Sequence, residues 1–275
     1  MKTRTQGKIA FVLAKGRNSL AVMPAAGGNV RRLVRGGSVS TPSWSPDRRR
    51  LVFSWGRRHK PAQLYLVRVA DRSVRKLTRG PYSSIEPDWS RDGRRIAFVR
   101  VGEGPTHIEV LDVRTGRLRR LVKGRQLDGA PAFSPRSGRM AFTRLVPGPK
   151  DEEEEVFNKD IFVARADGSR PFRVTRAEGP DSDPAWSPNG RWIAYSAGDG
   201  ARVRIWIMRA NGTGKRAITQ GPLDVEPTWS PDGRSIAFTR RVRRGASIAV
   251  VTVAALRPYS VTPSRLGAAS SPDWG

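Results

Sequence analysis

A short motif recurs five times along the chain, and one further copy is divided between the two ends. The complete copies follow the pattern Pro-x-Trp-Ser-Pro-Asp-Gly-x-x-Ile-Ala-Phe, with local variations, and occupy residues 42–53, 87–98, 131–142, 184–195 and 227–238. The first part of the sixth copy ends the chain at residues 272–275, and its second part stands at residues 7–11. A repeat divided in this way indicates that the two ends meet in one structural unit, so that the repeats close into a ring.

The spacing of the motif aromatics indicates what each repeat contains. Successive aromatics are 45, 44, 53, 43 and 45 residues apart, and they are Trp44, Trp89, Phe133, Trp186, Trp229 and Trp274. These lengths are typical of four-stranded propeller blades. The sequence therefore predicts an all-β, six-bladed propeller, a single domain over residues 1–275, whose last blade is shared between residues 7–35 and 270–275. We expect the six aromatics to be structural.

Each repeat carries four strand signals. The Pro-x-Trp-Ser segment leads into a Pro-Asp-Gly turn, where Gly accepts a positive φ, and the alternating Ile-Ala-Phe strand follows. A third apolar run comes next, and a fourth strand often ends in Thr, as at Thr78 and Thr219. Arg48 stands where other copies have Gly, which would cost on the order of 1 kcal/mol if that position is left-handed. Gly138 is displaced by one position in the third copy.

These copies resemble the WD40-like PD40 repeats of the TolB family of six-bladed propellers. The resemblance covers nearly the whole chain and implies the fold, but it implies little about function, because the repeated residues are those that build the blade. TolB-like proteins typically carry a separate α/β domain before the propeller, for which this chain leaves no room. Similar blades also occur fused to prolyl-oligopeptidase-type hydrolase domains, and no such domain is present in this sequence.

Composition bounds the compartment and the chemistry. The chain has no cysteine, which excludes disulfides and thiolate metal sites, and no apolar run of 18 residues that would span a membrane. The basic N-terminus does not resemble a signal peptide, because the apolar segment 9–14 is too short. We expect a cytoplasmic protein, or a periplasmic or secreted one if a signal peptide has been removed.

The net charge is +27, from 51 Lys and Arg against 24 Asp and Glu. This charge suits an anionic partner such as nucleic acid or an anionic surface, but scattered arginines on solvent-facing strands would give the same total. The densest clusters, at residues 48–50, 57–60 and 240–244, lie in different repeats. Single-strand-binding surfaces usually interleave aromatic and basic side chains, and here only Trp55 adjoins such a cluster.

Recognisable catalytic machinery is absent from the sequence. The two histidines, His59 and His107, belong to no known catalytic motif, and there is neither a Gly-x-Ser-x-Gly elbow nor an HExxH motif. A propeller enzyme would need a metal or carboxylate site in its channel. We expect no enzyme activity and no cofactor, although acidic residues in the channel would suit a divalent cation.

The residue before each motif proline is predicted to lie near the central channel. Three of these six residues are acidic, namely Glu86, Asp183 and Glu226, and three more acids stand slightly upstream, namely Asp128, Asp181 and Asp224. Converging carboxylates repel unless a cation, an arginine or a proton intervenes. They would form a site for a cation or a basic peptide at the linker face, which is the end of the ring where the chain passes from one blade to the next. Alternatively, they would accept hydrogen bonds from neighbouring backbone amides and offset the charge of nearby arginines.

The long third repeat contains an insertion with five successive acids, Asp151, Glu152, Glu153, Glu154 and Glu155. Such a run stays solvated. It would be either an acidic arm for a basic partner or a divalent ion, or a loop that docks onto the protein's own arginines.

These observations favour a monomeric, non-catalytic scaffold that binds a protein or peptide at the linker face and channel mouth. Electrostatic binding of nucleic acid or an anionic surface is the second hypothesis. A propeller enzyme with a metal or carboxylate site is the third.

Overall fold

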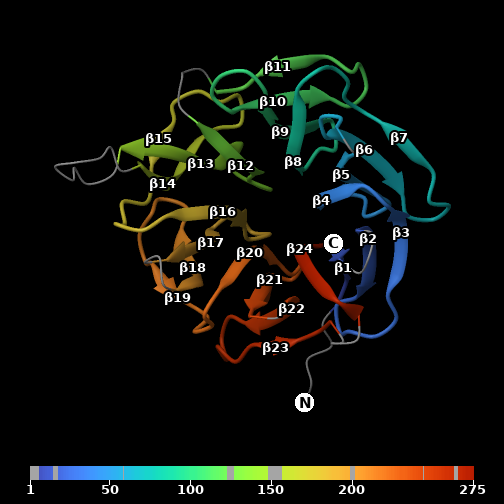
Figure 1. Cartoon of the computed structure of the whole chain (residues 1–275). Coiled ribbons are helices and arrows are strands. Elements are labelled where there is room, and N and C mark those ends of the chain that lie inside the picture. The colour runs from blue at the N-terminus through green and yellow to red at the C-terminus, as the bar shows by residue number, and fades with distance from the viewer. Residues whose placement is uncertain are drawn as a thin grey trace.

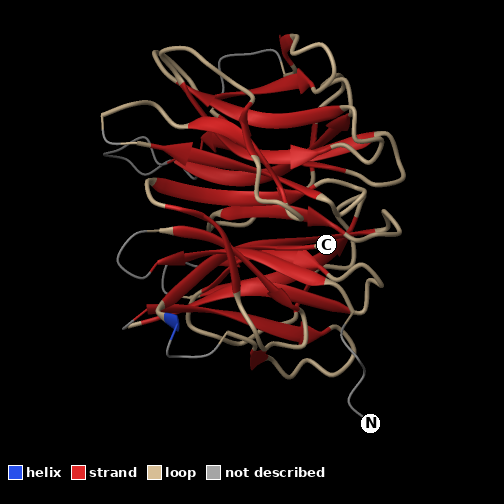
Figure 2. Ribbon diagram, turned by 90° about the vertical axis from the view of Figure 1, so that its right-hand side faces the viewer, coloured by secondary structure: helices blue, strands red, loops and turns tan. Residues whose placement is uncertain are grey.

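A computed structural model of the chain describes residues 6–14, 18–57, 59–122, 127–147, 157–198, 202–243, 245–262 and 266–275. Within these ranges, strands form six four-stranded antiparallel sheets arranged as blades around a central axis (Figure 1). A view from the side shows strands through the full height of the molecule (Figure 2). The prediction of an all-β six-bladed propeller is therefore confirmed.

Each blade runs from an innermost strand beside the axis to a short outermost strand, and the blades are numbered here by their motif copies. Blade 1 holds β4 (Ser38–Trp44), β5 (Arg50–Gly56), β6 (Gln63–Arg68) and β7 (Val74–Lys76). Blade 2 holds β8 (Ser83–Trp89), β9 (Arg95–Val101), β10 (His107–Asp112) and β11 (Leu118–Arg120). Blade 3 holds β12 (Asp128–Phe133), β13 (Arg139–Pro147), β14 (Phe157–Arg165) and β15 (Phe172–Arg173).

The remaining blades follow the same plan. Blade 4 holds β16 (Asp181–Trp186), β17 (Trp192–Gly198), β18 (Val203–Arg209) and β19 (Arg216–Ala217). Blade 5 holds β20 (Asp224–Trp229), β21 (Ser235–Val242), β22 (Gly245–Thr252) and β23 (Tyr259–Ser260). Blade 6 is the shared blade, with β24 (Ala268–Trp274) innermost and then β1 (Lys8–Ala14), β2 (Ser19–Pro24) and β3 (Arg31–Arg35).

The ring closes through this shared blade. Strand β24 pairs antiparallel with β1, with Trp274 opposite Ile9. The backbone amides of Lys8 and Gly275 donate to each other's carbonyl oxygens at 2.8 and 2.9 Å. The Trp274 indole also donates to the Gln6 carbonyl oxygen at 2.9 Å. Residues far apart in sequence thus complete one sheet, as the divided motif predicts.

The hydrophobic core lies between neighbouring blades. The motif aromatic on each second strand is almost fully buried, at 0–2% exposure, and these residues are Phe11, Phe53, Phe98, Phe142, Tyr195 and Phe238. The motif aromatics on the innermost strands are 6–8% exposed. Several of them also cross the blade boundary by a hydrogen bond, since the indoles of Trp186 and Trp229 each donate at 3.1 Å to a carbonyl oxygen of the preceding blade.

The repeated Ser-Pro-Asp-Gly segment forms the turn between the first and second strands. In blade 2, Ser90 Oγ donates to Asp92 at 2.6 Å and accepts the Arg95 amide at 3.0 Å. The Gly that follows Asp92 has a φ of +67°, and the corresponding residue of blade 1, Arg48, has a φ of +56°. Arg48 therefore does occupy a left-handed position, at a cost of roughly 1 kcal/mol.

The recurring Thr after the fourth strand ties that strand to the third. Thr78 Oγ1 accepts the backbone amide of Leu64 at 2.9 Å, and Thr219 Oγ1 accepts that of Ile205 at 3.0 Å. The outermost strands have only two to five residues. A buried hydroxyl therefore supplements the few ladder bonds that such short strands can make.

Candidate functional site: the axial cavity

The residue before each motif proline has a left-handed backbone in all six blades. These residues have φ values between +42° and +58°, and they are Thr41, Glu86, Ala130, Asp183, Glu226 and Ser271. The pairing register of each innermost strand shifts at this point, so each residue forms a β-bulge. None of the six is glycine. Strained positions of this kind often cluster at binding sites, and here they form a ring around the axis.

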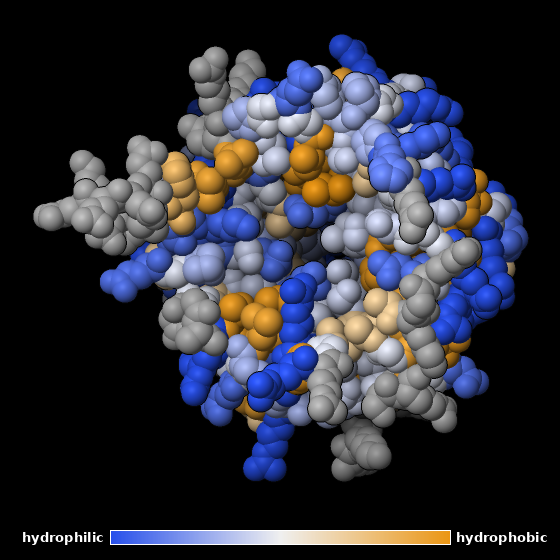
Figure 3. Space-filling view, viewed as in Figure 1, coloured by the Kyte–Doolittle hydropathy of each residue, from blue (hydrophilic) through white to orange (hydrophobic). Residues whose placement is uncertain are grey.

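All six bulge residues line one axial cavity of about 770 Å³. Figure 3 shows the centre of the ring hollowed. The sequence prediction that these residues lie at the central channel is therefore confirmed. The cavity continues from them past the motif aromatics to the turns between first and second strands, where its lining includes Pro46, Arg91, Arg136 and Pro231.

We call the end of the ring that carries these turns the turn face, and the opposite end, where the chain enters each innermost strand, the linker face. Because the lining residues extend to the turns, the cavity leads to the turn face. The sequence predicts a ligand-binding end at the linker face, whereas the residues that line the cavity extend to the turn face.

Two of the predicted channel acids bind backbone amides of the next blade. Glu86 Oε2 accepts the Ala130 amide at 2.7 Å, and Glu226 Oε2 accepts the Ser271 amide at 2.8 Å. Glu226 also lies 3.9 Å from the Arg241 guanidinium. These contacts match the structural interpretation offered by the sequence, in which channel acids satisfy neighbouring amides and offset arginines. Each carboxylate nevertheless remains on the cavity wall.

Among the described residues, the third predicted acid, Asp183, makes hydrogen bonds only within its own blade. Its Oδ2 accepts the hydroxyls of Ser182 and Ser196, each at 3.0 Å. Burial, and then the negative charge of Glu226, raise the pKa of Asp183. Burial likewise raises the pKa of Glu86, with added contributions from Asp183 and Glu226. The three acids therefore influence one another electrostatically across the channel.

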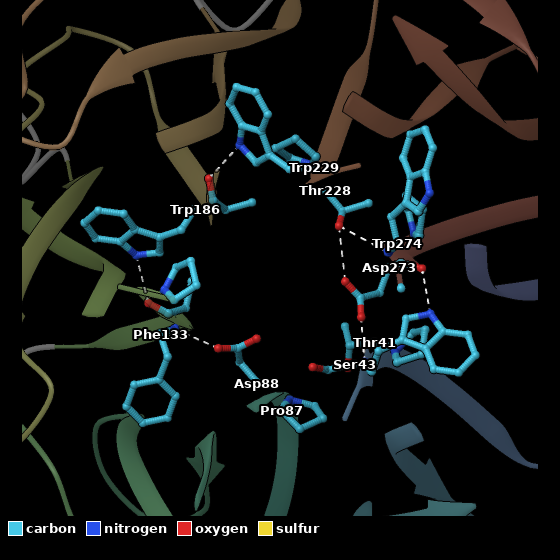
Figure 4. Close-up of a pocket in the computed structure, with 18 of the residues that line it drawn as sticks. Thr41, Ser43, Pro87, Asp88, Phe133, Trp186, Thr228, Trp229, Asp273 and Trp274 are labelled. Atoms are coloured by element: carbon cyan, nitrogen blue, oxygen red, sulfur yellow. Dashed lines mark hydrogen bonds between the residues drawn. The ribbon is translucent and has the colours of Figure 1, made fainter. Parts of the chain in front are cut away.

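Two further channel acids were missed by the sequence analysis. Asp88 and Asp273 follow the motif proline directly, and both point toward the cavity in Figure 4. Asp88 Oδ2 accepts the Phe133 amide at 2.7 Å, and Asp273 Oδ2 accepts the Trp44 amide at 2.6 Å. The signal that could have found them is the repeat itself, because this one position varies among Ser, Asp, Ala and Thr between blades.

The three upstream acids do not join the channel. Asp128 forms a two-pronged ion pair with Arg144, at 2.7 and 3.0 Å, and Asp224 forms the same pair with Arg240, at 2.7 and 2.8 Å. Each arginine stands directly opposite its aspartate on the second strand of the blade. The expectation that Asp128 and Asp224 reinforce the channel site is wrong, because the facing arginines hold them at the linker end of the strands.

Asp181 has no such arginine, because Ala197 occupies the facing position. Burial raises the pKa of Asp181 to about 6, and the nearby charge of Asp160 contributes to the increase. Asp181 is absent from the residues that line the axial cavity. It is therefore a buried acid of the linker end and not a channel ligand.

No group of three or more His, Cys, Asp or Glu side chains in the described ranges is arranged to hold a metal ion. The acidic run Asp151–Glu155 lies within residues 148–156, which are outside the described ranges. Within the parts of the chain that the structure describes, no helix is long and apolar enough to cross a membrane.

The basic cluster of blade 5 is largely occupied. Arg240 is held by Asp224, and Arg241 lies beside Glu226. His107 lies 3.4 Å from Glu109, and Glu109 pairs with the buried Arg100 at 2.8 Å, so this histidine belongs to the polar group around Glu109. Neither feature supplies a nucleophile and base in contact among the described residues.

The divided repeat, the blades and the axial cavity together define a six-bladed propeller built of PD40-type repeats. The chain belongs to the TolB β-propeller family, because the PD40 TolB β-propeller domain matches residues 73–274, well over half of its length.

Two relatives and one crystal structure show what the chain is similar to. It is 29% identical over 157 residues to "Uncharacterized peptidase YuxL" of Bacillus subtilis, covering 57% of this chain and 21% of that protein. It is 28% identical over 159 residues to "Protein TolB homolog" of Chlorobium luteolum, covering 56% of this chain and 32% of that protein. The match thus spans a third or less of these two relatives. The crystal structure of TolB from Acinetobacter baumannii superposes with a TM-score of 0.85 at 19% identity, covering 99% of this chain and 67% of that one.

The Asp88→Asn variant is expected to be more stable than the parent at alkaline pH. Burial raises the pKa of Asp88 to about 8, with the charge of Asp273 contributing. The folded protein therefore holds a proton between about pH 4 and 8 that the unfolded chain releases, and the parent loses stability as the pH rises through that window. Asparagine stays neutral and keeps the oxygen that accepts the Phe133 amide.

At about pH 8.5 we expect the free energy of unfolding of Asp88→Asn to exceed that of the parent by roughly 1–3 kcal/mol. Water in the channel reduces the gain below the value that the whole pKa shift would give. Near pH 4 the two proteins should differ little. Urea unfolding of both proteins at each pH measures it. An equal gain at both pH values would show that the ionisation of Asp88 is not the cause.

Proposed function

We propose that this protein is a non-catalytic binding scaffold whose axial cavity receives a cationic group of a protein or peptide partner. The observation that carries the proposal is the set of acidic side chains on the cavity wall. Five carboxyl groups from four blades line the cavity in a protein of net charge +27, and they are Glu86, Asp88, Asp183, Glu226 and Asp273. Burial raises the pKa of four of them, namely Glu86, Asp88, Asp183 and Asp273. An inserted ammonium or guanidinium would favour their ionised forms and would replace repulsion between them with attraction.

The rim of the cavity has the opposite charge. Arg48, Arg91 and Arg136 lie at the turn face, and the last two donate to carbonyl oxygens of the next blade, at 3.1 and 3.3 Å. A partner would therefore present a cationic side chain or N-terminus to the depth of the cavity and polar or acidic groups to its rim. The volume of about 770 Å³ falls within the usual range of ligand pockets and suits one or a few inserted side chains.

Family membership is the ground on which we propose binding. Propellers of the TolB family commonly bind proteins, and this chain has no recognisable catalytic motif. One relative is named as a peptidase, but the match covers only 21% of that protein. We propose further that the protein acts as a monomer, which size-exclusion chromatography with light scattering would test.

The decisive experiment selects peptides from a random display library on the immobilised protein. We expect enriched peptides to carry Lys or Arg, and replacing that residue with Gln to weaken binding at least about tenfold. Asp183→Asn should weaken the same peptides by a similar factor, because the amide keeps the hydrogen bonds from Ser182 and Ser196 but removes the charge. Isothermal titration calorimetry measures the affinities.

The matched control is Asp167→Asn, which removes one charge from an exposed turn of blade 3. It should leave peptide affinity unchanged. Enriched peptides without cationic residues, or equal affinity in the parent and in Asp183→Asn, would overturn the proposal. Titration with Mg²⁺ or Ca²⁺ tests the same carboxylates for a divalent cation.

A further inference from the structure

A second cavity, of about 890 Å³, lies at the turn face between blade 6 and blade 1. Four segments bring cationic side chains to it, namely the start of β1, the start of β3, the turn before β5 and the end of β6. We call it the basic hollow, and its cations are Lys8, Arg31, Arg48, Arg49, Arg50 and Arg68. Asp47 is the one acid among the described residues that line it.

Three of these six cations already have partners. Arg50 pairs with Asp47 at 3.3 Å, Arg68 pairs with Asp71 at 3.0 Å, and the Arg31 guanidinium donates to the Val69 carbonyl oxygen. Among the described residues, the side chains of Lys8, Arg48 and Arg49 make no hydrogen bond or ion pair. Within the described ranges, the six cations of the hollow therefore outnumber its one acid, Asp47, whose charge is shared between Arg50 and Arg49.

Arg48 distinguishes this hollow from a surface that is basic only by composition. The corresponding turn position is glycine in blades 2, 4 and 5, with φ values of +67°, +68° and +70°. Blade 1 keeps the same left-handed turn but places an arginine in it, at a φ of +56°. A strained residue at an otherwise glycine position is evidence for a role of its side chain, and this side chain lines the basic hollow.

The remaining lining favours a compact ligand over a polymer. The floor is apolar, formed in part by Val22, Met23 and Val69. No aromatic residue is found among the described residues that line the hollow. Proteins that follow single-stranded nucleic acids generally stack bases on aromatic side chains. The cations instead surround a single concave space, where several N–H donors can meet one group of phosphate oxygens.

The geometry points to a binding site for a compact, multiply charged phosphate compound in the basic hollow. Its phosphate oxygens contact Lys8, Arg48 and Arg49, and any organic part rests on the apolar floor. Arg48 also lies on the rim of the axial cavity, but Lys8 and Arg49 line the basic hollow alone and Asp183 lines the axial cavity alone. Asp183→Asn should therefore leave phosphate binding unchanged.

The test uses calorimetric titration with tripolyphosphate and with ATP at about 150 mM salt. Parent protein should bind one equivalent saturably, and Arg48→Gly should bind at least about tenfold more weakly. The matched control is Arg170→Gly, another arginine with a left-handed backbone, at a φ of +52°, which lines neither cavity. It removes the same charge and relieves the same type of strain, and it should bind like the parent.

Both glycine variants should unfold at or above the parent's midpoint, which separates lost binding from misfolding. Arg49→Ala provides a second variant, with a loss of binding expected as for Arg48→Gly. Equal weakening in Arg48→Gly and Arg170→Gly would show an effect of net charge alone and overturn the inference. The absence of saturable binding would also overturn it. The same holds if a short single-stranded oligonucleotide binds in a way that depends on Arg48 while tripolyphosphate and ATP do not bind.

Discussion

Deletion of residues 270–275 is expected to lower the thermal midpoint of unfolding by more than about 10 °C. The deletion removes most of β24, which forms the innermost strand of blade 6. It takes away Trp274, whose loss alone is worth roughly 3–5 kcal/mol as a large core truncation, and each kcal/mol corresponds to about 2–4 °C in a domain of this size. Differential scanning calorimetry measures the change.

A circular permutant provides the control. In a chain that begins at residue 268 and joins Gly275 to Gln6, β24 precedes β1 directly, and the two strands keep the pairing in which Ile9 faces Trp274. The new chain ends then lie in the original connection between β23 and β24. We expect this permutant to recover most of the stability lost by deletion. A deletion variant that melts like the parent would show that the shared blade is not needed for closure.

Trp229→Ala is expected to lower the free energy of unfolding by roughly 3–5 kcal/mol. The indole is 6% exposed, packs between blades 4 and 5, and donates to the Ala185 carbonyl oxygen at 3.1 Å. Trp229→Phe should cost only about 1–2 kcal/mol, because blade 3 already carries Phe133 at the same position. Chemical denaturation measures both variants.

Trp192→Ala is the matched control, since this half-buried tryptophan lies outside the motif position and stacks with the Arg209 guanidinium at its surface. It should cost clearly less than Trp229→Ala. Trp229 also lines the axial cavity, so the variant separates two roles. Full stability with loss of peptide binding would mean that the motif tryptophans serve the ligand and not the blade.

The blades and their closure could be predicted because they repeat. Six copies of one pattern average out local ambiguity, and the divided copy places β24 beside β1 without any three-dimensional information. The left-handed turn at Arg48 was also predictable, since glycine marks that position in the neighbouring copies.

The site was less accessible from sequence, for physical reasons. A residue before proline usually adopts an extended backbone, yet Glu86, Asp183 and Glu226 have positive φ values, which reflect a bulge imposed by the closed ring. The partners of Asp128 and Asp224 depend on the strand register, which places Arg144 and Arg240 opposite them. The direction of the cavity depends on the packing of six strands at once, and no single repeat encodes it.

The position of β24 in the chain has a consequence for biosynthesis. Blades 1 to 5 are each contiguous in sequence and can pair their own strands as they leave the ribosome, whereas β1 is made first and its partner is made last. The inner edge of β1 therefore carries unpaired N–H and C=O groups during most of translation, a state that invites pairing with another nascent chain. Fast synthesis from crowded polysomes should favour exchange of β24 between molecules, so that the yield of rings closed within one chain depends on the rate of expression as well as on the sequence.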